Sequence, residues 1–349
     1  MLRETIEKIK PIDTDLMEEA QRKLDNLTKP QGSLGRLEEW AKQVVGITGK
    51  IEPNLERKVI FTMAGDHGVV EERVSAYPKE VTPQMVYNFL SGGAGINVLA
   101  KHVGAEVVVV DMGVAEELKT QNSKLKTKKI GYGTKNMAKG PAMTRDEAIR
   151  AIEAGIEVFE EEGKIDIVGT GDMGIANTTP SSAIVAVFTG ESPERVTGKG
   201  TGIDDASWRN KVEVIERALE VNKPDPSDPI DVLSKIGGFE IGGLVGVILA
   251  GAAHRIPVVI DGFISGAAAL IAVGLEPKVK DYLFAAHCSV EIGHRIALEK
   301  MGLRPILDLN LRLGEGTGAA LGINLIDAGC KILTQMATFG SAGVSEKVR

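Results

Sequence analysis

One acidic side chain, Glu315, stands between glycines in the segment Leu311 to Gly322, which reads LRLGEGTGAALG. An apolar segment precedes this turn, and the pattern predicts a long helix from about Ala319 to Met336 after it. Because glycine leaves the backbone uncovered, a flat or anionic ligand could lie directly on main-chain N–H groups beside the carboxylate. Alternatively, Gly314 and Gly316 only end one element, and Glu315 complements the dipole of the next helix. The segment by itself favours neither interpretation.

A second glycine-rich segment, Ile165 to Thr179, reads IDIVGTGDMGIANTT. It predicts a strand, a glycine loop and a helix, with Thr179 as N-cap and Pro180 at the first helical position. The glycines that match the pattern G-x-G-x-x-G are Gly169, Gly171 and Gly174. No second strand ending in an acid follows about twenty residues later, so the dinucleotide signature is weak. A cradle for phosphate or ribose is favoured over a purely structural turn, because loop N–H groups and a helix N-terminus suit an anion.

The remaining motifs exclude several kinds of chemistry. Gly198 to Asp205, GKGTGIDD, is glycine-rich and carries a lysine, but it lacks the spacing of a Walker loop, and Lys211 just beyond it reads by default as a solvated lysine. His287 and His294 lie seven apart and would be a poor metal pair, and HExxH is absent, so we expect no metal. The lack of G-x-S-x-G argues against covalent acyl chemistry.

Short β-branched runs alternate with helical stretches from about residue 59 onward. The predicted strands are Val59 to Ala64, Glu106 to Asp111, Ile165 to Gly169, Ile256 to Asp261, Tyr282 to His287 and Pro305 to Leu311. The helical stretches include Thr82 to Val103, Thr144 to Glu162, Gly242 to His254 and Ser265 to Val273. This alternation predicts βαβ units, an α/β fold with a mostly parallel sheet and helices on both faces.

Polar, mostly glycine-flanked residues close five of these strands. They are Gly65-Asp66-His67-Gly68, Asp111-Met112-Gly113, Gly169-Thr170-Gly171-Asp172, Asp261-Gly262 and His287-Cys288-Ser289. Ligands of an open parallel sheet bind at the carboxyl ends of its strands, so we expect these residues to share one rim. The lysine-rich stretch from Lys119 to Lys139 reads as a solvated loop.

The opening of the chain differs from the rest because it predicts helices and no strand. The helices are Met1 to Lys10, Thr14 to Leu27 with Thr14 as N-cap, and Arg36 to Thr48. We therefore expect the first fifty residues or so to lie outside the sheet.

Composition bounds the class of protein. Aromatic residues make up 4% of the chain, and 41 of its 349 residues are glycine. This composition suits a helix-covered parallel sheet, in which aliphatic side chains pack closely against the backbone. A net charge of −7 argues against a nucleic-acid or acidic-membrane surface. The longest apolar run, Gly242 to Ala253, is too short to span a bilayer, and the first residues do not read as a signal peptide, so we expect none. Cys288 and Cys330 form no CxxC, so we expect a cytoplasmic protein.

Seven blocks of the sequence are specific when taken together: KPQGSLGRLE from Lys29, AGDHGVV from Ala64, VSAYPKEVTPQMV from Val74, GGAGIN from Gly92, GTGDMGIANTTPSSA from Gly169, Asp261-Gly262, and LGEGTGAA from Leu313. They resemble the nicotinate-nucleotide:dimethylbenzimidazole phosphoribosyltransferase family, which assembles the lower-ligand nucleotide of cobalamin. The resemblance covers essentially the whole chain in order. It implies a Rossmann-like sheet of about six strands, a smaller helical domain built from both chain ends, and a homodimer. The implied division is residues 1–52 and 314–349 for the small domain and 53–313 for the large one.

The resemblance also implies the reaction and its residues. The 5-phosphoribosyl group of nicotinate mononucleotide would pass to 5,6-dimethylbenzimidazole, giving α-ribazole 5′-phosphate and nicotinate, with no cofactor. Glu315 matches the family's catalytic base, and Asp172 and Lys211 match two further active-site positions. Residues implied to bind the substrates are Ser75, Tyr77 and Gln84 for the benzimidazole, and Gly169, Gly171, Gly174, Asn177, Asp261, Gly262, Ser289, Gly314 and Gly316 for the rest. Asp172 departs from the family, which carries Glu there.

This reaction could run with so sparse a site. Nicotinate leaves from an already cationic nitrogen, so no general acid is needed, and one base that removes the azole proton is enough. Direct attack from the opposite face turns the β-nucleotide into an α-riboside without a covalent intermediate. The apolar surroundings of Glu315 should raise its pKa. Two other functions stay open: a nicotinamide-dependent oxidoreductase using Gly169 to Gly174, and a non-catalytic nucleotide-binding module, which would leave Glu315 without a role.

Overall fold

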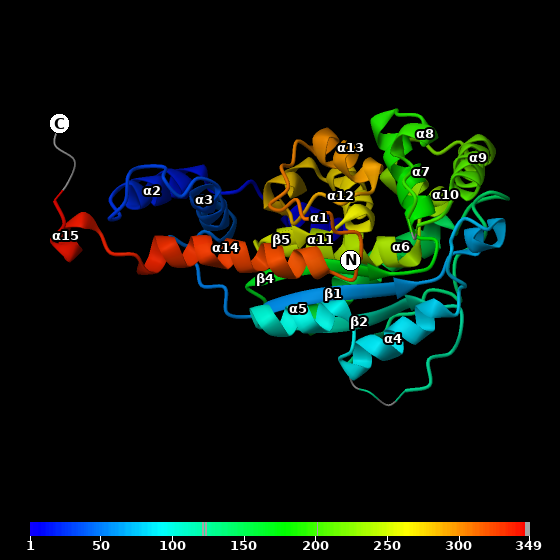
Figure 1. The fold of residues 1–349 in the computed structure, drawn as a ribbon, viewed down its shortest axis with the longest axis horizontal. Helices are drawn as coiled ribbons and strands as arrows, with labels where there is room; N and C mark the ends of the chain where they lie inside the picture. Colours follow the sequence, from blue (N-terminus) through cyan, green and yellow to red (C-terminus); the bar gives the residue numbers. More distant parts are fainter. Residues whose placement is uncertain (121, 123, 201, 346–349) are drawn as a thin grey trace.

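The computed structural model describes residues 1–120, 122, 124–200 and 202–345. Six strands form one sheet in the order β3-β2-β1-β4-β5-β6, and every neighbouring pair runs parallel (Figure 1). The strands are β1 (Lys58–Gly65), β2 (Ala105–Gly113), β3 (Leu125–Thr127), β4 (Ile167–Met173), β5 (Val258–Ile260) and β6 (Leu283–Ala285). The predicted α/β fold with a parallel sheet is confirmed.

Helices cover both faces of the sheet (Figure 1). One face packs against α6 (Arg145–Glu161), α11 (Phe239–Ala253) and α12 (Phe263–Leu275), and the other against α4 (Val81–Ser91), α5 (Gly95–Val103) and α14 (Thr317–Gln335). The other helical elements are α1 (Leu2–Lys8), α2 (Thr14–Asp25), α3 (Arg36–Thr48), η1 (Gly68–Glu72), α7 (Thr178–Thr189), α8 (Pro193–Val196), α9 (Asp205–Asn222), α10 (Pro229–Ile236), η2 (Pro277–Tyr282), α13 (Ile292–Met301) and α15 (Phe339–Ala342). The β1, β2 and β4 strands at the centre are almost completely buried toward their carboxyl ends.

A second, smaller core lies where α2 and α3 pack against the far half of α14 (Figure 1). It consists of Ala20, Leu24, Leu27, Ala41, Val45 and Leu333. The near half of α14 instead packs on the sheet, since Ile323 and Ile326 belong to the main core. One helix therefore joins the two cores. The division into residues 1–52 with 314–349 and 53–313 stays a prediction, and residues 346–349 lie outside the described part of the chain.

Two predicted elements at the edges of the sheet were wrong. The stretch from Pro305 to Leu311 is not a strand and forms a single bridge, Leu307 with His287. Pro305 has no N–H to extend the pairing toward the start of the stretch, and beyond Leu307 the next main-chain hydrogen bond is from the Val290 N–H to the Leu311 carbonyl at 3.3 Å. The outermost strand is instead β3, inside the lysine-rich stretch expected to be a loop. Its residues pair with Val109 to Asp111 of β2. The lysines around them had indicated a solvated loop.

The predicted helix from Thr82 to Val103 is two helices. Gly92 ends α4 with a φ of 80°, and α5 begins afresh at Gly95. The caps of two other helices also differ from expectation. Asp13, not Thr14, caps α2, its side chain accepting the N–H of Leu16 at 2.9 Å. Asn177 precedes α7, so that the expected cap, Thr179, lies inside the helix.

Candidate active site

Glu315 lies at the start of α14, in a turn whose residues all have left-handed backbone: φ is 78° at Gly314, 64° at Glu315 and 98° at Gly316. A side chain is uncommon in this conformation, and such strain is typical of functional sites. The Glu315 N–H donates to the carbonyl of Asp172 at 3.2 Å, and the Thr62 hydroxyl donates to the Glu315 carbonyl at 2.9 Å. The backbone thus holds a 4% exposed carboxyl group against β1 and β4.

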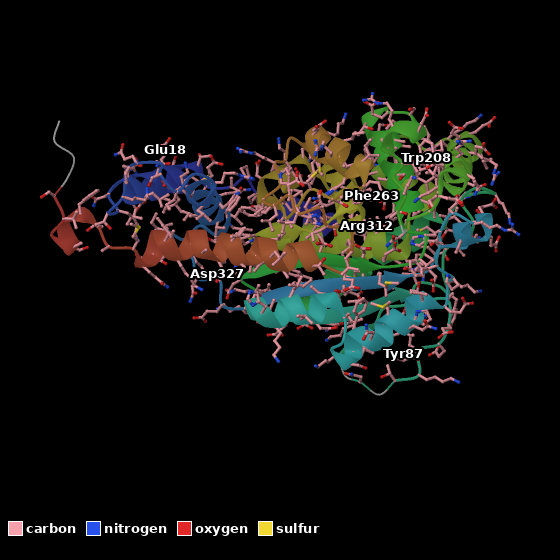
Figure 2. All side chains as sticks on the ribbon, in the orientation of Figure 1. Glu18, Tyr87, Trp208, Phe263, Arg312 and Asp327 are labelled. Carbon is pink, nitrogen blue, oxygen red and sulfur yellow. The ribbon has the colours of Figure 1, made fainter. Side chains whose placement is uncertain are left out.

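The side chain of Glu315 is held by one main-chain donor. Its Oε2 accepts the N–H of Ile96, at the start of α5, over 3.1 Å. Burial raises the pKa of Glu315; the Ile96 N–H opposes this rise and the Asp261 carboxylate adds to it. Arg312, the nearest basic residue in the sequence, is exposed beside the start of α14 (Figure 2). The predicted rise in the pKa of Glu315 is therefore present, and burial is its main cause.

Asp172, near the end of β4, is the second acid at this site. Its Oδ2 accepts from the side-chain amide of Asn177 at 2.8 Å, while its buried Oδ1 makes no hydrogen bond within the described residues. Burial raises the pKa of Asp172 to about 8, and the carboxylates of Asp261, Glu240 and Glu315 also raise it. The carboxyl group is therefore mostly protonated at neutral pH, so it can donate a hydrogen bond from its free oxygen.

Asp261 holds in place the turn that carries Glu315. Its carboxylate is fully buried and accepts two main-chain N–H groups at the start of α14: Gly316 at 3.1 Å on Oδ2 and Ala319 at 3.0 Å on Oδ1. These contacts lower the pKa of Asp261, although burial raises it more. Asp261 thus anchors the helix that carries Glu315. Its expected contact with ribose or phosphate stays a prediction.

The glycines expected to form a phosphate loop lie elsewhere than expected. Gly169 and Gly171 are inside β4. A Cβ on Gly171 would overlap the carbonyl oxygen of Glu315, and one on Gly169 would lie 3.2 Å from the Cβ of Ala319. A Cβ on Gly174 would meet the carbonyl of Gly65. The missing side chains thus let α14 and the Glu315 turn approach the sheet. The predicted loop was wrong at Gly169 and Gly171, because β4 extends to Met173, and the substrate contacts expected of these glycines stay a prediction.

Lys211 is buried, not solvated as its sequence context suggested. It is 1% exposed in α9, and its Nζ donates to the Thr178 hydroxyl at 2.6 Å. Burial lowers the pKa of Lys211 to about 8, against the opposing effect of the Glu291 carboxylate. Thr178 is the first residue of α7, so the lysine nitrogen lies at a helix N-terminus. A lysine ammonium at the positive end of a helix dipole can bind an anion such as phosphate.

Gly262 and Ser289 each contact a buried histidine, Gly262 at His287 and Ser289 at His294. Nε2 of His287 is 3.8 Å from Oδ1 of Asp261, and a Cβ on Gly262 would lie 3.2 Å from the same nitrogen. Ser289 is buried, and its N–H donates to Nδ1 of His294 at 3.0 Å. Burial lowers the pKa of His294 to about 3, so this ring is neutral and can accept. Both residues therefore lie on the rim that also carries Asp261.

Of the residues implied to bind the benzimidazole, Ser75 and Tyr77 precede α4 and Gln84 lies in its first turn. Ser75 Oγ accepts the N–H of Tyr77 at 3.3 Å, and both Tyr77 and Gln84 are exposed. Thr82, between them and the sheet, accepts the N–H of Ile175 at 3.1 Å, which ties the start of α4 to the turn after β4. No hydrogen bond or ion pair described for the chain joins these three residues to Glu315, so their part in the site stays a prediction.

Sequence reasoning missed a buried pair beneath the rim. Nε2 of His67 lies 2.7 Å from Oε1 of Glu240, and both side chains are almost fully buried. A Cβ on Gly174 would be 3.3 Å from the same His67 nitrogen. The signal that could have found it was His67 in the polar ending of β1. Ile96, by contrast, acts through its main-chain N–H and leaves no mark in the sequence.

No group of three His, Cys, Asp or Glu side chains within residues 1–120, 122, 124–200 and 202–345 is placed to hold a metal ion. In the same part of the chain, no helix combines the length and the apolar character needed to cross a membrane.

Comparison with known proteins gives one consistent result. A phosphoribosyltransferase family model matches residues 9–344. Proteins named nicotinate-nucleotide–dimethylbenzimidazole phosphoribosyltransferase are similar along their whole length: that of Geobacter sulfurreducens is 60% identical over 99% of both chains, and that of Desulforudis audaxviator is 60% identical over 99% of this chain and 98% of its own. A crystal structure of the enzyme so named from Thermus thermophilus is 44% identical, with a TM-score of 0.90 over 96% of this chain and 100% of that one.

Proposed function

This chain belongs to the nicotinate-nucleotide–dimethylbenzimidazole phosphoribosyltransferase family, and we propose that it transfers the 5-phosphoribosyl group of nicotinate mononucleotide to 5,6-dimethylbenzimidazole. The products are nicotinate and α-ribazole 5′-phosphate, the nucleotide of the cobalamin lower ligand. Close similarity over nearly the whole chain supports this function, and so does a site built around one buried base.

The bond changes balance with a single proton acceptor. One azole nitrogen attacks the anomeric carbon while the bond from that carbon to the pyridinium nitrogen breaks. The bonding electrons return to the pyridine ring, which neutralises its positive charge. The azole would become cationic, and the proton on its other nitrogen passes to the enzyme. Attack from the face opposite nicotinate inverts the anomeric centre, so no covalent sugar–enzyme intermediate is needed.

Glu315 takes this proton, and its hydrogen bonding is the observation that carries the proposal. Oε2 is held by the Ile96 N–H, whereas Oε1 makes no hydrogen bond within the described residues. One oxygen is thus oriented and the other is free to accept. The raised pKa moves the carboxyl group toward working pH, where a general base is most effective.

Asp172 and Lys211 serve the anionic donor. A protonated Asp172 adds no negative charge beside the carboxylate of nicotinate, and its free Oδ1 can donate a hydrogen bond. Lys211 and the start of α7 suit the 5′-phosphate. This moves the proposed phosphate site from the glycines of β4 to the N-terminus of α7.

The direct test is to incubate the protein with nicotinate mononucleotide and 5,6-dimethylbenzimidazole and to follow both products by chromatography. Nicotinate and α-ribazole 5′-phosphate should appear in equal amounts. Nicotinate released without the riboside would indicate a hydrolase and would contradict the proposal. Tight binding of NADH without binding of the mononucleotide would favour an oxidoreductase, although β4 leaves no open glycine loop for a dinucleotide.

We further propose a homodimer in the cytoplasm. Four apolar side chains near the site are about half exposed or more: Val290, Ile292, Leu309 and Leu313. A second chain that covered them would remove this surface from water. Both cysteines are free and buried, as is usual in a reducing compartment. Sedimentation at micromolar concentration should give twice the chain mass of 37.1 kDa; a monomer would refute the dimer.

A further inference from the structure

Helix α5 begins with a residue that cannot cap it. Its N-cap is Ala94, which has no side-chain acceptor, although the first N–H groups of a helix need one. The acceptor comes from the other end of the chain, because Ile96, the second residue of α5, donates its N–H to Oε2 of Glu315 over 3.1 Å. Glu315 therefore takes the place of an N-cap side chain. The positive end of the helix dipole faces its carboxylate.

The side-chain amide of Asn97 fixes this helix start. Its Oδ1 accepts the N–H of Ala94 at 3.0 Å, and its Nδ2 donates at 3.1 Å to the carbonyl of Phe89, in the last turn of α4. One amide thus bridges the break between α4 and α5. Gly95 completes the approach, since a Cβ there would lie 2.9 Å from Leu313 and 3.4 Å from Oε2 of Glu315. Three consecutive positions of α5 are therefore shaped around the Glu315 carboxylate.

We propose that Asn97 is a positioning residue for the proton transfer: its amide holds the start of α5 so that the Ile96 N–H fixes Oε2 of Glu315 and leaves Oε1 to accept the azole proton. This inference rests on the proposed role of Glu315 as the base. The side chain of Asn97 bonds to Ala94 and Phe89 and not to Glu315, so that it acts through Ile96. Nothing in the reaction itself requires the base to lie at a helix start, so the device is a property of this fold.

Loss of the Ile96 hydrogen bond should change the pH dependence of the reaction. The titratable and charged groups nearest Glu315 are Asp172 from β4, Asp261 from the end of β5 and Arg312 from its own loop. A change at Asn97 leaves all three in place and weakens only the hydrogen bond to the ionised carboxylate. Loss of that bond favours the protonated form, so a higher pH is needed to keep the base ionised.

The experiment compares kcat/KM against pH for the whole protein and two variants. Asn97→Ala removes the bridge between α4 and α5. Ala94→Ser leaves the bridge but gives α5 a hydroxyl that competes with Glu315 for the first N–H groups. The matched control is Glu147→Ala, which removes the corresponding side-chain bridge of α6, where Glu147 Oε2 accepts the Thr144 N–H at 2.8 Å, far from the site. Substrate ionisations contribute equally to all four profiles.

Both site variants should move the acid limb upward by about half to one pH unit, and Asn97→Ala should lower kcat at neutral pH by about tenfold. KM for nicotinate mononucleotide should change less than about twofold, since no bond to the donor is lost. Melting temperature should fall for Asn97→Ala and for Glu147→Ala, but not for Ala94→Ser. Asn97→Ala and Ala94→Ser should therefore share the pH shift but differ in melting temperature, which shows that the shift comes from the position of Glu315 and not from weaker folding. Glu147→Ala should lose stability and keep the pH profile of the parent.

Two results would count against this inference in different ways. If the acid limb stays unmoved in Asn97→Ala and Ala94→Ser while Glu315→Gln abolishes turnover, the role of Asn97 is overturned and the proposed function stands. If Glu315→Gln keeps its turnover, Glu315 is not the base, and the positioning role of Asn97 is overturned as well.

Discussion

The main-chain N–H of Glu315 donates to the carbonyl oxygen of Asp172 over 3.2 Å, so the two acids of the site are joined through backbone. Gly314 packs against the carboxyl group of Asp172: a Cβ on it would be 3.3 Å from both carboxyl oxygens. The spacing of the two acids is therefore set by β4 and the start of α14, not by flexible side chains. Sites built on such elements are held more accurately than sites on loops.

Asp172→Asn should stabilise the protein most at high pH. The pKa of Asp172 is about 8 in the fold, against about 4 in an unfolded chain, so the folded state retains the proton more strongly. The cost of ionising this buried group is absent below pH 4, grows as the pH rises, and is complete above pH 8. Asn carries no such cost, which by linkage amounts to several kcal/mol.

Urea unfolding of both proteins at pH 5 and at pH 8.5 measures this difference. The advantage of Asp172→Asn should be larger at pH 8.5 by about 2–5 kcal/mol. Turnover at pH 7 should stay within about tenfold of the parent, because an amide can replace a neutral acid as a donor. An equal effect on stability at both pH values would mean that Asp172 is already ionised at pH 5.

Gly171→Ala should disturb Glu315 and leave nucleotide binding less affected. The new Cβ would overlap the carbonyl oxygen of Glu315, so the turn must shift. Overpacking of this kind costs about 1–3 kcal/mol of stability, and a shift of the base should lower kcat. Gly140→Ala is the control, since a Cβ at Gly140 meets nothing within 4 Å.

Steady-state kinetics and calorimetric titration with nicotinate mononucleotide distinguish this account from a phosphate cradle at β4. A fall in kcat with nearly unchanged mononucleotide affinity supports the packing role of Gly171. A normal kcat with strongly weakened affinity for nicotinate mononucleotide would instead support a phosphate site at the glycines of β4.

The buried pair of His67 and Glu240 should stabilise the fold below a limiting pH. Burial lowers the pKa of His67, but the Glu240 carboxylate outweighs this and raises it above its usual value. Stability from this pair is therefore complete below about pH 6.5 and is lost as the pH rises through the raised pKa. Glu240→Gln leaves a buried imidazolium without its counter-charge and should cost about 3–5 kcal/mol at pH 6.

Glu160→Gln is a matched control, because Glu160 pairs with His254 at 2.6 Å on the surface, where both side chains are more than two-fifths exposed. It should cost no more than about 1 kcal/mol. Unfolding free energies at pH 6 and pH 9 should show the Glu240→Gln effect shrinking at the higher pH. An effect that is constant with pH would show that His67 is neutral throughout.

The sequence predicted the sheet but not every local detail. Alternating apolar runs and helical stretches were sufficient for a parallel α/β fold, because burial of both sheet faces imposes that pattern. The pattern failed at β3, where lysines follow a strand that has one exposed edge, and at the stretch from Pro305 to Leu311, which bends away after one bridge. In both places tertiary contacts, not local propensity, decide the structure.

The candidate site shows the same limit. The setting of Glu315 between glycines, together with the family blocks, was enough to mark it as the candidate base. The burial of Lys211 was hidden, because a charged side chain reads as solvated unless its partner is known. Gly171 packs against the main chain of Glu315, which lies far along the sequence. The spacing of the glycines suggested a bound ligand at a place where the fold has this main-chain segment. The Ile96 N–H could not be predicted, because a main-chain donor does not depend on residue type and because the sequence predicted one unbroken helix from Thr82 to Val103.

The central claim is that Glu315 accepts the azole proton, and Glu315→Gln tests it most directly. Glutamine keeps the size of the side chain and can still accept the Ile96 N–H, but it is a far weaker base. The measurement is the single-turnover rate of α-ribazole 5′-phosphate formation, with mononucleotide affinity and melting temperature determined on the same preparation. We expect the rate to fall by two to four decades, about 3–5 kcal/mol of barrier, with affinity and melting temperature nearly unchanged. A variant that lost stability but kept its rate per folded molecule would contradict this account and would leave Glu315 as a charge that only caps α5.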